Sequence, residues 1–286
     1  MQDAGPAYRN QAFPLRAMKT LRLRTFLLLL IGFGVLSVGS VYAQTSLGPA
    51  PRDSQAIGFL TQSLTGAGGI SNLTAARDFV GNGRIVWYWS DAEVEGTVSA
   101  KGRGITQFRL DCSSPQGNKS MVINNGSVSS LASDGSQKPL SNPSIASLTY
   151  IASPMVFLAA AFADPSYGVQ YIGLEAKYGT QVHHIRLQKT FPTDRDPDGN
   201  MSKATRKDIF VSDSDRTVVA LSDMIQPDER PWEQYQHEIV FSNYRRVSGI
   251  LVPFSLSEFT AGQRTFSIEF SSVAINTGLT DSDFAS

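Results

Sequence analysis

Apolar and polar residues alternate with a period of two over most of the chain after residue 75, and this pattern limits the possible folds more than any other feature. In residues 106–112, Phe108, Leu110 and Cys112 alternate with polar residues. Successive side chains of a β-strand point to opposite faces, so each such segment predicts a strand with one apolar face. The expected strands are 85–89, 94–101, 106–112, 121–123, 168–178, 180–190, 206–213, 216–223, 234–243, 249–259 and 264–276. About ten short strands in series predict a mainly β protein.

Turn signals and the lack of linkers support a single β domain. Asn125-Gly126 directly follows the short apolar run at 121–123, and Asn-Gly is the strongest short signal for a β-hairpin. No stretch rich in Pro or in Gly and Ser divides residues 53–286. We therefore expect residues 53–286 to form one domain, with a flexible leader at 44–52.

Two segments depart from the β pattern and predict helices. Asp53 or Ser54 could cap a short helix that ends at the glycines 66–69. In mid-chain, Ser153-Pro154 is a typical helix start and Asp164-Pro165 a typical stop. The residues between are apolar on nearly every side and include Met155, Phe157, Leu158 and Phe162. A helix of this kind has to be covered on most sides or has to cover something apolar itself.

The N-terminal residues 1–43 are typical of a cleavable secretory signal peptide. Basic residues up to Arg24 precede an apolar run at 26–35, and small residues follow up to Ala43. The run is shorter than the roughly 20 residues that a membrane-spanning helix needs, although an uncleaved anchor remains the alternative. We predict cleavage after Ala43 and a periplasmic location, with Met18 as a possible true start.

Charge and cysteine usage exclude several functions. The chain has 25 basic and 25 acidic residues, and without residues 1–43 it has 20 basic and 24 acidic ones, a net charge of −4. A mildly acidic domain without a basic run is a poor binder of nucleic acids. Cys112 is the single cysteine, so no intramolecular disulfide forms, and we expect this residue to be packed within a strand.

Several residues are candidates for a binding or metal site. The indoles of Trp87 and Trp89 share one strand face, where they could stack on a ligand or pack in the core. Asp194, Asp196 and Asp198, followed by Gly199, match the first half of a calcium loop, but the glutamate at its twelfth position is missing. An acidic turn explains the same residues. His183 and His184 are neighbours on a strand and face opposite ways, so we expect no zinc site. The chain after residue 43 has neither a phosphate-binding glycine loop nor a dinucleotide fingerprint, so we expect no cofactor.

Two C-terminal segments resemble a known family. Residues 241–254 resemble the strand–turn–strand near the end of LolA/LolB-type periplasmic lipoprotein carriers, and residues 273–284 look like their closing strand and tail. The resemblance implies a strongly curved antiparallel sheet, a half-open barrel covered by a helical lid, whose cavity binds acyl chains. The helix at 154–163 would be that lid. Met155, Phe157, Leu158 and Phe162 would line the cavity or plug it when empty.

These observations leave three functional hypotheses. The first is an exported, non-enzymatic protein that binds an apolar small molecule or the acyl chains of a lipid or lipoprotein. The second is a structural or sensory envelope protein of the same fold that has a filled interior and acts through contacts with a membrane or protein partner. The third is a hydrolase of unknown type, which would require His237, an acidic residue and a serine in one cleft.

Overall fold

The computed structural model describes residues 50–89, 92–139, 153–226 and 232–285. The predicted signal peptide, and the predicted leader up to residue 49, lie outside these ranges. The strands are β1 (Asp78–Trp89), β2 (Ala92–Arg103), β3 (Gln107–Ser114), β4 (Gly117–Asn124), β5 (Ser127–Ala132), β6 (Gln137–Pro139), β7 (Tyr167–Lys177), β8 (Thr180–Lys189), β9 (Lys207–Ser212), β10 (Val218–Ile225), β11 (Tyr235–Val247), β12 (Ile250–Thr260) and β13 (Gln263–Ile275). The helices are α1 (Ser54–Gly66), α2 (Ile70–Ala75), α3 (Pro154–Ala163), α4 (Asn200–Ala204) and the 3-10 helix η2 (Asp281–Phe284).

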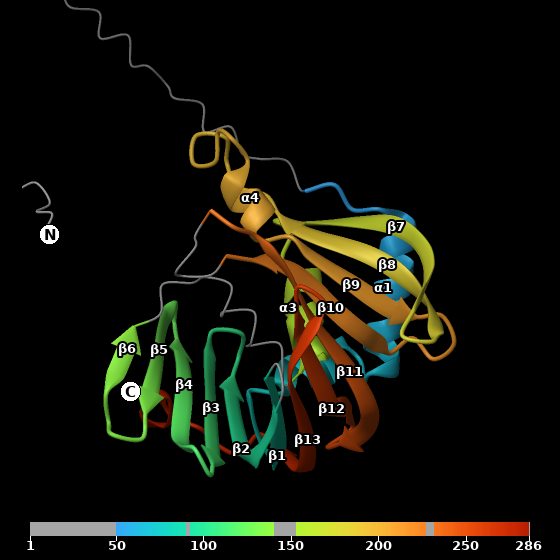
Figure 1. Ribbon diagram of the computed structural model, residues 1–286. Helices are drawn as coiled ribbons and strands as arrows, with labels where there is room; N and C mark the ends of the chain where they lie inside the picture. The colour runs from blue at the N-terminus through green and yellow to red at the C-terminus, as the bar shows by residue number, and fades with distance from the viewer. Residues whose placement is uncertain (1–49, 90–91, 140–152, 227–231, 286) are drawn as a thin grey trace, which may run out of the picture. The chain divides into compact units, whose positions relative to one another are not determined.

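All thirteen strands belong to one antiparallel sheet, in the order β6-β5-β4-β3-β2-β1-β13-β12-β11-β10-β9-β8-β7 (Figure 1). Two meanders, β1–β6 and β7–β13, are joined through the pairing of β1 with β13. The edge strands β6 and β7 each have a single strand neighbour, so the described strands do not close into a barrel. The predicted mainly β fold with an open, curved antiparallel sheet is confirmed.

The connection between the two edges explains where α3 lies. The chain leaves the sheet at β6 and returns at β7, at the opposite edge. A connection between opposite edges has to cross one face of the sheet, and α3 belongs to that connection. On this face, here called the inner face, α3 contacts α1, α2 and β10. The predicted helix at 154–163 is confirmed, with Ser153 accepting a hydrogen bond from the amide of Val156 as its cap.

Irregular pairing bends the sheet at the junction of the two meanders. β1 has a register shift between Asn82 and Gly83 where it pairs with β13. A Cβ atom on Gly83 would lie 2.1 Å from the carbonyl oxygen of Glu269, so only glycine permits this close approach. A second shift lies in β12 beside Phe259. Such bulges increase twist and bending, which turns the two meanders toward the helices.

One apolar core fills the inner face. It contains buried residues from α1 and α3 and from strands of both meanders, including Leu60, Leu158, Phe108 and Ile268. The alternation predicted for 106–112 is confirmed, because Phe108 and Leu110 are core residues whereas Arg109 and Asp111 pair on the other face. None of the helices among the described residues is long and apolar enough to span a membrane.

The residues before α1 are attached to the sheet. Asp53 caps α1 by accepting hydrogen bonds from the amides of Gln55 and Ala56, as predicted. The amide of Asp53 also donates to the carbonyl of Val169 in β7, and the amide of Val169 donates to Pro51. The end of the predicted leader therefore runs parallel to the first residues of β7.

A buried carboxylate and a buried phenyl ring hold the C-terminal tail to the outer face. Asp78 accepts hydrogen bonds from the amide and hydroxyl of Thr277 and from the amides of Gly278 and Leu279. Burial alone would raise the pKa of Asp78, but these donors offset that effect and hold the pKa below its usual value. At the end of the tail, Phe284 is fully buried.

We expect Phe284→Ala to lower the free energy of unfolding by about 3–5 kcal/mol, because the substitution removes a completely buried ring and leaves a cavity. Ser282→Ala, in the same turn but exposed, should change it by less than about 0.5 kcal/mol. Urea unfolding of the two variants measures both effects. Equal stabilities would show that the tail does not contribute to the folded domain.

Candidate ligand-binding cleft

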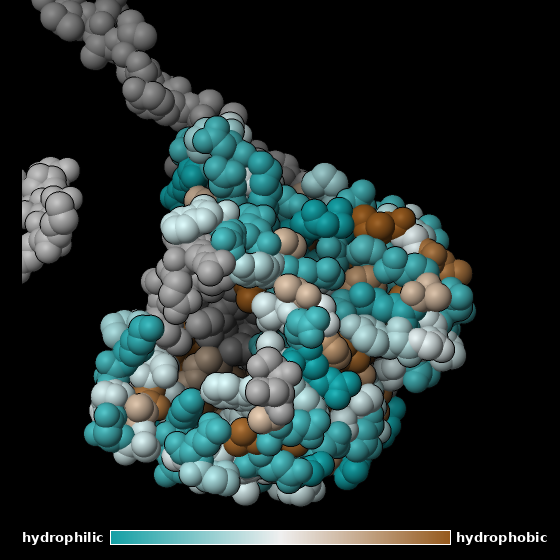
Figure 2. All heavy atoms as spheres, in the orientation of Figure 1, coloured by the Kyte–Doolittle hydropathy of each residue, from teal (hydrophilic) through white to brown (hydrophobic). Residues whose placement is uncertain are grey.

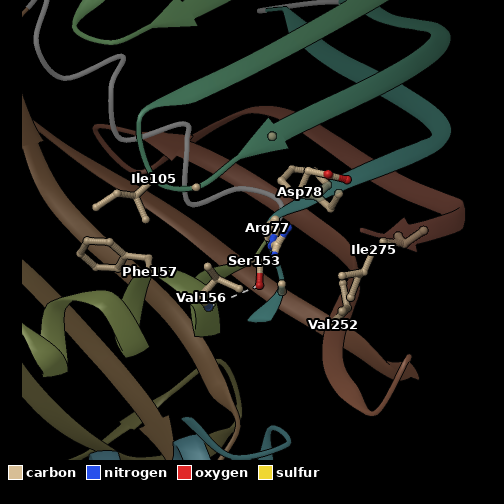
Figure 3. A pocket seen from close by; sticks show the side chains of 13 residues that line it. Arg77, Asp78, Ile105, Ser153, Val156, Phe157, Val252 and Ile275 are labelled. Carbon is tan, nitrogen blue, oxygen red and sulfur yellow. Dashed lines mark hydrogen bonds between the residues drawn. The ribbon is translucent and has the colours of Figure 1, made fainter. Parts of the chain in front are cut away.

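An apolar cleft lies on the inner face, between the start of α3 and the sheet (Figure 3). It is lined by Ala76, Arg77, Asp78, Phe79, Gly102, Gly104, Ile105, Ser153, Val156, Phe157, Val252, Val273 and Ile275. Its volume is about 30 Å³, which is enough for a few atoms of a small molecule only. Side chains therefore fill most of the space beneath α3 in this state.

The walls of the cleft come from elements that are distant in the sequence. Val252 in β12 and Val273 in β13 lie on the sheet, and Val156 and Phe157 lie on the first turn of α3. Phe79 in β1 packs over Gly102 in β2, where an added Cβ atom would lie 2.1 Å from the Phe79 ring. A larger residue at position 102 would therefore push the Phe79 ring away from its place in the wall.

Contacts with apolar side chains hold α3 in place. Among the described residues, the hydrogen bonds that reach α3 from outside involve its ends only. Ser153 caps the first turn, and the guanidinium of Arg52 donates to the carbonyl of Phe162 at 2.8 Å. The middle of the helix has no polar side chain to anchor it. An apolar ligand could therefore replace the side-chain contacts along the middle of this helix without leaving a polar side chain unpaired there.

The predicted site residues on α3 are distributed over the core, and only one of them reaches the cleft. Phe157 lines the cleft. Met155 and Leu158 are buried in the core, each with 1% of its surface exposed. Phe162 is half-buried against the same core, and the guanidinium of Arg52 lies 5.0 Å from the centre of its ring. A role of these side chains in ligand binding stays a prediction.

The predicted tryptophan pair lies apart from the cleft. Trp87 is half-buried against the core, which agrees with the packing alternative. Trp89 is 55% exposed, and the ammonium of Lys119 lies 6.0 Å from its ring centre. The cleft is lined by neither indole. Val156, Val252, Val273 and Arg77 were not among the predicted site residues. The strict alternation of Phe266, Ile268 and Phe270 would place Val273 on the opposite face, and the register shift at Asn82/Gly83 brings it to the cleft.

A second, larger hollow lies on the sheet across β13, β1, β2, β3 and β4. Its volume is about 880 Å³, it is wide open, and most of its lining side chains are polar, among them Thr97, Ser99 and Ser113. Two of the charged residues along it are paired, Arg84 with Glu95 and Asp111 with Arg109, and Glu269 accepts a hydrogen bond from the Ser255 hydroxyl. Burial raises the pKa of the Cys112 thiol beside it to about 12, so this cysteine is not a reactive thiolate.

The acidic segment that resembles a calcium loop has another role. Asp196 accepts hydrogen bonds from the amides of Met201 and Ser202 and from the Ser202 hydroxyl, and thereby orders α4. Asp194 and Asp198 are exposed. Within the described ranges, no group of three His, Cys, Asp or Glu side chains is placed to hold a metal ion. The geometry thus supports the turn interpretation of this segment.

His237 belongs to a buried row of charges on the inner face, which extends across β9, β10, β11 and β12. Its Nδ1 atom lies 2.8 Å from the carboxylate of Asp223, and its Nε2 atom lies 3.1 Å from that of Glu258. Lys207 pairs with Asp223 on the far side of the row. The nearby Ser222 hydroxyl donates to the main-chain carbonyl of His237, not to its ring. Both ring nitrogens therefore contact carboxylates, which leaves neither to activate a serine.

Exposed apolar side chains gather on the edge strand β7. Ile172 and Leu174 are 40% and 55% exposed, and Tyr178 in the following turn is 47% exposed. Figure 2 shows brown groups over β7 on a face that is otherwise largely hydrophilic. Within the described ranges, this edge of β7 pairs only with the segment before α1, at Val169, so the rest of the edge is open to contacts with another molecule.

Comparisons with known proteins identify the fold. No protein-family model matches the chain, and no curated protein matches it at a significant level. Solved structures do match. A domain from Vibrio parahaemolyticus, assigned provisionally to outer membrane lipoprotein sorting, is 9% identical, with a TM-score of 0.50, and the match covers 80% of this chain and 96% of that one.

A LolA superfamily protein from Nitrosomonas europaea matches similarly. It is 11% identical, with a TM-score of 0.50, and the match covers 81% of this chain and 97% of that one. At these identities the likeness shows the fold alone. The chain therefore has a LolA-like fold, as its C-terminal segments indicated, and its function has to be argued from its own residues.

The charged row predicts a specific pH dependence of stability. Burial alone would lower the pKa of His237, but the hydrogen bonds and charges of Asp223 and Glu258 raise it from 6.5 to about 9. Because the folded state holds this proton more tightly, the stabilisation is complete below pH 6.5 and is lost as the pH rises through 9. Urea unfolding across this range should show the free energy of unfolding falling with pH.

A variant separates this effect from general alkaline instability. Glu258→Gln removes one carboxylate partner, so the pKa of His237 in the folded state should drop while its unfolded value of 6.5 stays the same. The fall in the free energy of unfolding should therefore be smaller and should end at a lower pH than in wild type. Glu269→Gln, at an exposed position of β13, should keep the wild-type profile. Identical profiles for all three proteins would contradict the proposed charge row.

Proposed function

We propose that the chain is an exported periplasmic protein that binds acyl chains of a lipid or lipoprotein, or another apolar ligand, between the inner face of its sheet and α3. It needs no cofactor and catalyses no reaction in this role. The observation that carries the proposal is α3 itself, an apolar helix in the bend of a curved sheet with an apolar cleft at its first turn. The fold shared with two solved structures supports the proposal, because one of those proteins is provisionally assigned to outer membrane lipoprotein sorting.

The size of the cleft determines how binding would occur. A volume of about 30 Å³ does not hold an acyl chain, so α3 has to move away from the sheet before a chain enters. Each methylene removed from water contributes about 0.8 kcal/mol, which is the driving force available to displace the helix. Apolar contacts replace apolar contacts along most of the helix, and the hydrogen bond from Arg52 to the Phe162 carbonyl is the polar contact that the movement has to break. In the empty state, Phe157 and the neighbouring side chains occupy the site.

Lipid that co-purifies with the protein is the first test. The full chain is expressed with its own N-terminal segment, purified from the periplasm, extracted with organic solvent and analysed by mass spectrometry. We expect lipid in a fixed ratio to protein. A protein that reaches the periplasm, folds and yields no lipid would count against the proposal.

A bulky side chain in the cleft should weaken the binding of an apolar dye. Val156→Trp places an indole where the cleft passes the first turn of α3, and we expect its affinity for the neutral dye Nile red to fall by about tenfold or more. Ala163→Trp adds the same indole to the same helix at an exposed position outside the lining, and it should bind like wild type. Dye fluorescence measures both affinities. Equal binding by the two variants would place the dye elsewhere.

A second function is favoured by a different observation. The tightly filled inner face and the exposed Ile172 and Leu174 on β7 suit a protein that acts through contact with a partner in the envelope. In that case the interior stays closed, so neither lipid nor Nile red binds, and Val156→Trp changes only stability. The lipid and dye experiments therefore discriminate between the two functions.

A further inference from the structure

One positive charge stands at the apolar cleft without a counter-charge. Arg77 lines the cleft and its side chain is exposed. Its main-chain amide donates to Asn276, but no hydrogen bond or ion pair of its guanidinium is found within the part of the chain that the structure describes. Figure 3 shows Arg77, the residue directly before β1, among Val156, Val252 and Ile275.

The adjacent carboxylate does not neutralise Arg77. Asp78 already accepts four hydrogen bonds, two from Thr277 and one each from Gly278 and Leu279, at 2.5–3.3 Å. These donors occupy both oxygens of the carboxylate, which points away from the apolar residues of the cleft in Figure 3. The carboxylate of Asp78 thus binds the C-terminal tail and does not pair with the guanidinium of Arg77, which can bind an anionic ligand instead.

Other arginines of the same meander are engaged. Arg84 pairs with Glu95, Arg103 with Asp281, and Arg109 with Asp111. Arg77 therefore differs from the arginines of β1, β2 and β3 because none of the described residues pairs with its five guanidinium N–H donors, which lie next to apolar walls. A planar guanidinium is suited to bind a carboxylate or phosphate through two parallel hydrogen bonds.

We propose that the cleft selects an anionic amphiphile, whose single oxyanion head, a carboxylate or a phosphate, pairs with Arg77 while its chain follows the apolar walls beneath α3. This inference rests on the proposed function, since it names the ligand class of the same cleft. Arg77 supplies selectivity for the head, and Val156, Phe157, Val252 and Val273 supply affinity for the chain. Because the head stays at the rim, Arg77 remains partly hydrated and the pairing weakens as salt increases.

The test compares ligands that differ only in their heads. Dodecanoate, dodecyl phosphate and dodecanol are titrated at pH 8 against wild-type protein loaded with Nile red. We expect at least one of the two anions to displace the dye at about tenfold lower concentration than the alcohol. That anion identifies the head. Displacement by all three ligands at equal concentration would overturn the inference.

Two arginine variants complete the experiment. Arg77→Gln should lose the preference for the anion, with about a tenfold lower affinity for it and an unchanged affinity for dodecanol. Arg84→Gln removes the same charge from β1 outside the cleft and should behave like wild type. Circular dichroism and unfolding midpoints verify that both variants fold. A preference that survives in Arg77→Gln would also overturn the inference.

The outcomes separate this inference from the function on which it rests. If wild-type protein does not bind Nile red, the proposal of an apolar binding site is wrong, and the proposed preference for anionic heads is wrong as well. If wild type and both arginine variants bind the dye but do not distinguish dodecanoate or dodecyl phosphate from dodecanol, the apolar site holds and only the role of Arg77 is wrong.

Discussion

The burial of α3 on the inner face is the constraint on which the rest of the structure depends. Its ten residues from Pro154 to Ala163 carry no polar side chain, so water is a poor environment for any side of the helix. The chain has to cross the sheet between its two edges, and α3 occupies that crossing. A flat sheet would cover one side of such a helix, whereas a sheet bent at Gly83 and supplemented by α1 and α2 covers more of it.

A single carboxylate connects the cleft with the end of the chain. Asp78 fixes the start of β1 by binding the amides after β13, and this places Arg77 and Phe79 at the rim and in the wall of the cleft. The same interaction directs the tail across the outer face to Phe284. The cleft thus lies beside a corner of the sheet that main-chain and side-chain hydrogen bonds anchor, while α3 on its other side is held mainly by apolar contacts.

Local signals predicted much of the fold and little of the site. The period of two identified most strands, Ser153-Pro154 and Asp164-Pro165 bounded α3, and Asn125-Gly126 marked the turn between β4 and β5. The short elements α2, α4, β5, β6 and η2 were not predicted, because a few residues carry no measurable periodicity. Trp87 and Trp89 were selected for their chemistry, but a single strand does not reveal whether its aromatic face meets a cleft, the core or solvent.

The sequence by itself determined that the chain is mainly β, that one strongly apolar helix interrupts the strands, and that the tail resembles that of LolA-type carriers. These features depend on neighbours within a few residues, where period and turn chemistry act. Only the tertiary structure decided that Arg77, Val156, Val252 and Val273 meet in one cleft, and that His237 lies between two carboxylates. Those contacts join residues up to nearly two hundred positions apart, and the pairing order of the strands that creates them is not encoded in any local pattern.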